Sequence, residues 1–254
     1  MKRANALILA TSLVFCVSVP AAIATADTVT SEPTRGYMGH VTLDVTTGTM
    51  TWEANPAPLA AVDVYRTGTS ALGGLTSTDF TARWGDEVTT TATGILDEND
   101  FTIFNAPPAT SAGSLMTATF NIVFYDDANI TILGGYTTGT IDFGTGLPAG
   151  FYATVTVTGL AAFNINLNTT NIFLTQQVAT HSGPASRVGV VLMSPPVLVG
   201  TGSPTVFIAA STIGPGAFYN VNGVAQADPG YRIAIAQPVP TEAKTWGGVK
   251  GRYR

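Results

Sequence analysis

Histidine and cysteine, which often supply catalytic bases, nucleophiles and metal ligands, are scarce in this chain. Its 254 residues contain two histidines, His40 and His181, and one cysteine, Cys16. Neither histidine has a second one at the spacing of a zinc site. No Gly-x-Ser-x-Gly motif is present to expose a serine nucleophile on a sharp turn, so a Ser-His-Asp arrangement built on His181 has no support. We therefore expect no catalytic residues and no enzyme activity.

Carboxylates gather in two segments that we expect to be loops between strands. Asp97 and Asp100 delimit the segment Asp-Glu-Asn-Asp, and Asp126 and Asp127 open the segment Asp-Asp-Ala-Asn. Dense oxygen ligands in loops suit Ca²⁺, although neither segment has EF-hand spacing. Turn chemistry alone also explains Asp and Asn at such places, and a glycosidase would need two acids facing each other across a cleft. Calcium is the one candidate cofactor, with these four aspartates as its ligands.

Aromatic residues offer a second kind of site, because their rings stack on the apolar faces of sugars. Trp52 and Trp84 are the main candidates for carbohydrate contact. Further rings are available at Tyr65, Tyr136, Tyr152 and Tyr219. The alternative is that these aromatics are core residues or cross-strand partners, as most aromatics in strand patterns are.

Residues 1–26 have the features of a secretory signal peptide, which we expect to form a short helix. Lys2 and Arg3 precede a mostly apolar stretch over 6–24, which ends in a small-x-small motif at Ala24-Thr25-Ala26. A membrane anchor is the first alternative, but Thr, Ser and Pro interrupt the short apolar run. A lipoprotein is the second, but Phe15 stands before Cys16 where a lipobox takes a small residue. Cleavage after Ala26 would leave a mature chain without cysteine and without a transmembrane anchor, which excludes disulfides and thiol chemistry.

The charge is acidic overall and unevenly distributed. The chain has 16 acidic and 11 basic residues, a formal net charge of −5. This balance argues against a nucleic-acid partner, since phosphate contacts need Lys and Arg. Residues 242–254 differ from the rest, because they carry four basic side chains and one acidic one.

Alternation of apolar and polar residues with period two recurs along the chain and predicts many short strands. The cleanest example is 154–158, with the sequence TVTVT, and 37–54 has the pattern of a hairpin. Turn signals such as Gly73-Gly74 and Gly134-Gly135 separate the runs. No long amphipathic helix is predicted after residue 26. We expect an all-β, antiparallel β-sandwich of jelly-roll type over residues 55–237. A signal-peptide helix and an N-terminal segment with the hairpin (27–54) would precede it, and a basic tail (238–254) would follow.

Two stretches of the chain carry a family resemblance. One is Trp84-Gly85-Asp86-Glu87-Val88 with the Thr-rich strand after it, and the other runs from Thr117 to Leu160. The second contains Phe124-Tyr125-Asp126-Asp127 and Leu147-Pro148-Ala149-Gly150-Phe151. The two stretches resemble a family of secreted bacterial β-sandwich proteins, the PEP-CTERM or "choice-of-anchor" type of planctomycete-like surface proteins. The resemblance covers about half of the chain and implies a sandwich with a cell-surface or matrix role. It supplies no catalytic residues.

The C-terminal segment departs from that family's anchor. Pro238-Val239-Pro240-Thr241-Glu242 is similar to its first motif, but no apolar span follows. The chain instead ends in a sequence that resembles the short T-W-G-x-[IV]-K-x-x-Y-R endings of diverse secreted bacterial proteins. Its aromatic and basic side chains suit a receptor groove. A solvated tail without a role is the alternative. The residues expected to dock are Trp246, Gly247, Lys250, Tyr253 and Arg254.

Our first functional hypothesis is a non-enzymatic protein, secreted or displayed at the cell surface or in the extracellular matrix. Its partners would be the export machinery and a surface or sorting receptor, with self-assembly or glycan binding in addition. The second hypothesis is an extracellular carbohydrate-binding module, assisted by calcium.

Overall fold

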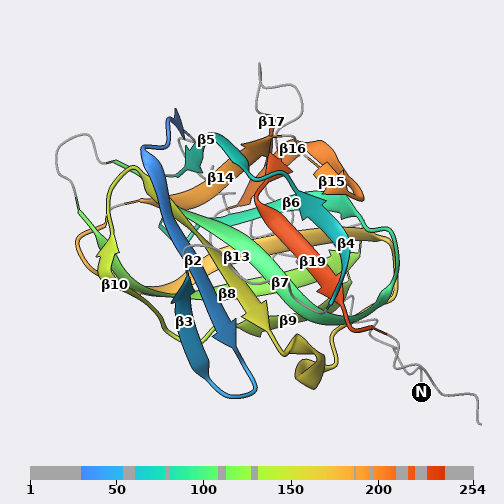
Figure 1. Ribbon diagram of the computed structural model, residues 1–254. Helices are drawn as coiled ribbons and strands as arrows, with labels where there is room; N and C mark the ends of the chain where they lie inside the picture. The colour runs from blue at the N-terminus through green and yellow to red at the C-terminus, as the bar shows by residue number, and fades with distance from the viewer. Residues whose placement is uncertain are drawn as a thin grey trace, which may run out of the picture.

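The protein folds as two β-sheets packed face to face, as the computed structural model shows (Figure 1). The structure describes residues 30–53, 61–77, 80–107, 113–126, 131–185, 187–194, 197–209, 217–220 and 228–237. Within them the helical content is one short 3-10 turn, η1 (Leu160–Phe163). The predicted all-β sandwich is confirmed.

The larger sheet has a main path and several strands attached to it. In hydrogen-bonded order, the path is β1 (Thr30–Glu32), β5 (Ser70–Thr76), β14 (Val188–Ser194), β7 (Gly94–Asn105), β11 (Phe151–Thr158), β2 (Gly36–Asp44) and β3 (Thr49–Glu53). The attached strands are β4 (Val62–Thr67), β12 (Asn166–Leu167), β15 (Val197–Val199), β18 (Asp228–Pro229) and β19 (Tyr231–Ile235). Figure 1 shows β19 between β4 and β7, and both are its pairing partners.

The smaller sheet is built around two long strands. Its order is β10 (Ile141–Leu147), β8 (Leu115–Asp126), β13 (Asn171–Ser182), β6 (Arg83–Thr89), β16 (Thr201–Ala209) and β17 (Ala217–Asn220). A further strand, β9 (Ile132–Thr137), pairs with β8. β8 lies between β13 and both β9 and β10.

Pairing is antiparallel throughout the described strands except between β2 and β11, which run parallel over eight residue pairs. More than a hundred residues separate these strands in the chain, so no tight hairpin dictates an antiparallel direction. β2 and β3 form an antiparallel hairpin where the sequence predicts one. This hairpin extends the larger sheet at the β11 edge.

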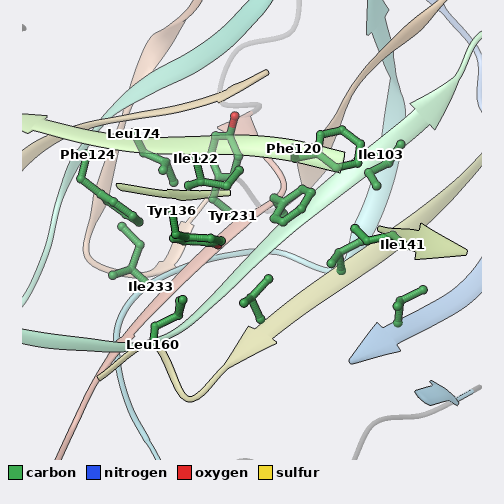
Figure 2. Close-up of a cluster of buried hydrophobic side chains, with 14 of the residues drawn as sticks. Ile103, Phe120, Ile122, Phe124, Tyr136, Ile141, Leu160, Leu174, Tyr231 and Ile233 are labelled. Carbon is green, nitrogen blue, oxygen red and sulfur yellow. The ribbon is translucent and has the colours of Figure 1, made fainter. Parts of the chain in front are cut away.

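The core lies between the sheets and takes alternate residues from each strand. Along β11, Ala153, Val155 and Val157 are buried in it, so Thr154 and Thr156 face the opposite side of the sheet. Figure 2 shows side chains from both sheets meeting in this core. Those labelled on β7 and β19 are Ile103, Tyr231 and Ile233, and those on β8 and β13 are Phe120, Ile122, Phe124 and Leu174.

A polar contact also ties the sheets together. Asn99 of β7 is fully buried, and its side chain donates to the carbonyl of Arg232 at 2.8 Å. It also accepts a hydrogen bond from the Tyr136 hydroxyl of β9 at 2.7 Å. A buried amide is tolerated only when it is paired in this way. Asn99 thereby fixes the position of β19, which forms one wall of the site described next.

Candidate functional site

A pocket of about 440 Å³ opens on the side of the larger sheet that faces away from the core. Six strands of that sheet (β2, β4, β7, β11, β14 and β19), with the turn that follows β4, contribute most of its lining. Its lining residues are Tyr37, His40, Arg66, Thr67, Gly68, Thr69, Asp100, Thr102, Tyr152, Thr154, Met193, Gly230, Tyr231 and Arg232. Its volume falls in the range of small-molecule sites in proteins.

A β-bulge in β2 brings two of these side chains to the same face. Tyr37 pairs with Tyr152 and His40 pairs with Thr154, so the partner strand advances two residues while β2 advances three. In a regular strand, residues three apart would point to opposite faces. The extra residue is accommodated at Gly39, whose φ of 136° favours glycine. The bulge is therefore what gives the pocket both a tyrosine and a histidine from one strand.

The floor of the pocket carries a chain of hydrogen bonds between three strands. Thr156 of β11 donates its hydroxyl proton to Asp100 at 2.7 Å. The same hydroxyl lies 2.5 Å from Nε2 of His40, and since its proton is already donated, the histidine is the donor there. Burial lowers the pKa of His40, partly opposed by the charge of Asp100. His40 is thus a neutral ring that is held in one orientation.

Arg232 of β19 is the cationic centre of the site. Its guanidinium contacts Asp63 at 2.6 Å, Glu98 at 2.8 Å and Asp100 at 3.4 Å. Burial raises the pKa of Asp100 and of Glu98, although Arg232 acts in the opposite direction on both. Burial by itself would lower the pKa of Arg232, but the carboxylates around it raise it. Arg232 and its three carboxylate partners hold one another in place, so these side chains have little conformational freedom.

Two tyrosines form the aromatic wall. The ring centroids of Tyr37 and Tyr152 lie 5.1 Å apart at a tilt of 40°. Tyr152 is nearly buried, whereas Tyr37 is 44% exposed and offers an open ring face or edge to a ligand. A side-chain hydrogen bond with Thr154 holds Tyr37 in place.

The arrangement can bind a polar ligand, but it lacks the parts of a hydrolytic site. Asp100 is the one carboxylate in the lining, so no second acid faces it across the described pocket. The hydroxyl nearest to His40 belongs to Thr156, which is completely buried and already donates to Asp100. His181 does not line the pocket and instead stacks on Phe80.

The expected calcium ligands are not brought together, and the first segment is not a loop. Residues 97–100 lie inside the continuous strand β7, because β19 and β11 pair with it on either side. Asp97 is half-buried where the β7–β19 register shifts, and Asp100 belongs to the pocket. Asp126 ends β8, and its carboxylate accepts a hydrogen bond from the backbone amide of Thr131. Asp127 lies outside the described residues.

Within the described residues, no group of three or more His, Cys, Asp or Glu side chains is arranged to hold a metal ion.

The two tryptophans expected to contact sugar lie away from the pocket. Trp84 is 3% exposed and packs inside a small cluster with Leu75 and Val190, so its ring is not available at the surface. Trp52 is 38% exposed, and its indole donates to the carbonyl of Asp142 at 3.0 Å while its ring packs edge-on against Phe143. Trp52 therefore connects β3 to β10 across the sandwich edge.

Residues 1–26 and the C-terminal residues Trp246, Gly247, Lys250, Tyr253 and Arg254 lie outside the described residues. In the part that the structure describes, no helix is long and apolar enough to cross a membrane.

Sequence reasoning did not select Tyr37, Thr156 or Arg232. One signal was available for Arg232, since a single arginine stands between apolar residues in the strand Tyr-Arg-Ile-Ala-Ile and such a charge needs partners when buried. No comparable signal marks Tyr37, because its place in the pocket depends on the bulge.

Scans against protein-family models, curated proteins and solved structures give no match to this chain.

Proposed function

We propose that this protein is a non-enzymatic exported protein that binds a neutral sugar unit of an extracellular glycan in the pocket of the larger sheet. The observation that carries the proposal is the convergence of an exposed tyrosine wall with fixed donors and acceptors in one hollow. Sugars need both features, since their apolar faces stack on rings and their hydroxyls need paired polar groups.

The charges around the pocket favour a neutral ligand. Asp63, Glu98 and Asp100 surround Arg232, and the second arginine, Arg66, is half-exposed and also pairs with Asp63 at 3.5 Å. The two cations therefore already have carboxylate partners, and an anionic ligand would have to compete with them. A polyhydroxyl ligand can instead use Asp100 as an acceptor and the arginines as donors without displacing any pair.

The test is a screen of the full chain on a glycan array, followed by titration with the best neutral oligosaccharide. Tyr37→Ala removes the open ring, and we expect it to weaken binding by tenfold or more, the order of one stacking contact of about 1.5 kcal/mol. Trp52→Ala is the matched control, because it removes a partly exposed aromatic outside the pocket lining. We expect this control to bind like the wild type.

Two outcomes would reject the pocket as the glycan site. The first is that no glycan binds. The second is that Trp52→Ala abolishes binding while Tyr37→Ala leaves it intact, which would move the site to the edge of the β2–β3 hairpin.

A further inference from the structure

Four buried oxygen-bearing side chains form a group inside the sandwich that plays no part in the proposed pocket chemistry. Asp86 comes from β6 of the smaller sheet, and Asp228, Tyr65 and Tyr231 come from β18, β4 and β19 of the larger sheet. All four side chains are nearly or completely buried, and Asp86 is 0% exposed. The group is therefore closed off from bulk solvent, so its oxygen atoms need hydrogen-bond or ionic partners inside the protein.

No hydrogen bond satisfies most of these oxygen atoms. Within the described residues, both carboxylate oxygens of Asp86 and the hydroxyls of Tyr65 and Tyr231 have no hydrogen-bond partner. The backbone amide of Glu87 partly offsets the effect of burial on the pKa of Asp86. Buried polar groups without partners are rare and need an explanation.

The four groups come from neighbouring strands, since β18 contacts β6 and β19 pairs with β4. Their charges also act on one another. Burial raises the pKa of Asp86 well above its usual range, and the charge of Asp228 adds to the effect. Burial also raises the pKa of Asp228, to about 6. The pKa of Tyr65 and that of Tyr231 are raised by burial first and by Asp86 next. Burial is the first cause in every case, and at Asp86, Tyr65 and Tyr231 the negative charge of a neighbouring aspartate adds to it.

No described cation relieves this charge. No ion pair within the described residues involves Asp86 or Asp228, and Arg232 is engaged with three other carboxylates. On the β16 side, Gly202 makes room for Asp228, because a Cβ atom there would lie 2.7 Å from Oδ2 of that carboxylate. Side chains that satisfied one another would be in hydrogen-bond contact, yet neither hydroxyl bonds to Asp86. Buried oxygen atoms that lack hydrogen-bond partners are the kind of ligand that a hard cation takes.

We propose that Asp86 and Asp228, with the hydroxyls of Tyr65 and Tyr231, form a binding site for a hard divalent cation such as Ca²⁺ between the two sheets. If both carboxylates bind through both oxygens, the four groups offer about six oxygen atoms, the lower end of calcium coordination. The site is distinct from Asp97, Asp126 and Asp127, and Tyr231 is the one residue that it shares with the lining of the pocket.

The test compares thermal unfolding of the full chain in EDTA and in millimolar Ca²⁺, the affinity range of extracellular calcium modules. We expect Ca²⁺ to raise the melting temperature of the wild type by roughly 3–6 °C, because the ion binds only the folded state. Asp86→Asn should lose this increase. Asp97→Asn, which removes a half-buried carboxylate of β7 outside the group, should keep it. If Asp86→Asn does not fold, Asp228→Asn replaces it.

Terbium provides a readout that does not depend on stability. Tb³⁺ occupies calcium sites and emits when nearby aromatic rings transfer energy to it, so Tyr65 and Tyr231 should sensitise it. We expect terbium emission from the wild type and from Asp97→Asn. Added Ca²⁺ should reduce this emission, because it displaces Tb³⁺ from the site. The proposal is overturned if melting curves with Ca²⁺ and EDTA superimpose and no emission appears, which would mean that a shared proton satisfies the pair. It is also overturned if Asp97→Asn, rather than Asp86→Asn, abolishes both signals.

Discussion

Arg232 determines what the pocket can bind. One guanidinium contacts Asp63, Glu98 and Asp100, so it cannot neutralise all three carboxylates. Burial raises the pKa of Asp100, and the nearby Arg232 and the Thr156 hydroxyl only partly oppose this effect. Removing the arginine would leave buried carboxylates unpaired, which costs more stability than the ion pairs contribute. The excess of carboxylates is the reason that we propose a neutral ligand rather than an anionic one.

At the level of single residues, the sequence does not show which side chains contact each other in the fold. His40 was recognised as having no histidine partner at metal spacing, and this remains true. Its actual partner, Thr156, is 116 residues away. A contact of that kind depends on strand register, and one chain read alone contains no record of which strand lies beside which.

The pH dependence of stability tests the buried state of His40. Because burial lowers its pKa from 6.5, its contribution is complete above that value and declines as the pH falls below it, when the unfolded chain binds the proton first. We expect wild-type stability to fall relative to that of His40→Gln between about pH 7 and pH 5. Urea denaturation midpoints of both proteins at each pH measure the difference. A constant difference across this range would show that His40 is not held neutral.

At the level of elements, period-two alternation predicted strands correctly where one face of the strand is apolar and buried. The TVTVT segment is β11, with its valines in the core. It did not predict a strand for Asp97 to Asp100, which the sequence places in a loop between two strands. These residues stay in β7 because Arg232 pairs with Glu98 and Asp100, and because Asn99 has partners in the core. Polar residues at strand positions can therefore mark a site rather than a turn.

The double glycines were also misread as turns. Gly73-Gly74 lies inside β5 and Gly134-Gly135 lies inside β9. The reason is space, since a Cβ atom on Gly74 would lie 2.1 Å from the Phe104 ring. Glycine within a strand often indicates such a close approach.

Replacing one of these glycines tests the interpretation. We expect Gly74→Ala to destabilise the protein by roughly 1–3 kcal/mol, because the new methyl group must displace Phe104 or the strand. Gly139→Ala is the matched control, since a Cβ atom there meets nothing within 4 Å. Chemical denaturation of both variants gives the two free energies of unfolding. Equal values would show that β5 can move away from Phe104 without cost.

At the scale of the whole molecule, composition and alternation were enough to predict the class, because a Thr-rich chain of this length can bury a core by stacking two sheets. The division of strands between the sheets was not predictable, and both candidate sites depend on it. Two consecutive residues of β19 contribute to different sites. Tyr231 packs in the core between the sheets, whereas Arg232 contacts Asp63, Glu98 and Asp100 beside the pocket.

The C-terminal tail is the part of the export proposal that can be tested separately from the fold. Residues 242–254 carry four basic side chains and two aromatic ones, whereas the rest of the chain is acidic. If a surface receptor binds this tail, deleting it should shift the protein from the cell surface to the medium in fractionated cultures. The melting temperature should not change, because the described sheets end before this segment.

A tail of scrambled sequence is the control for charge, since it keeps the composition but not the Trp246-Gly247 and Lys250 spacing. Retention at the surface with the scrambled tail would indicate that charge alone holds the protein there. An unchanged distribution after deletion would reject a sorting role for the tail.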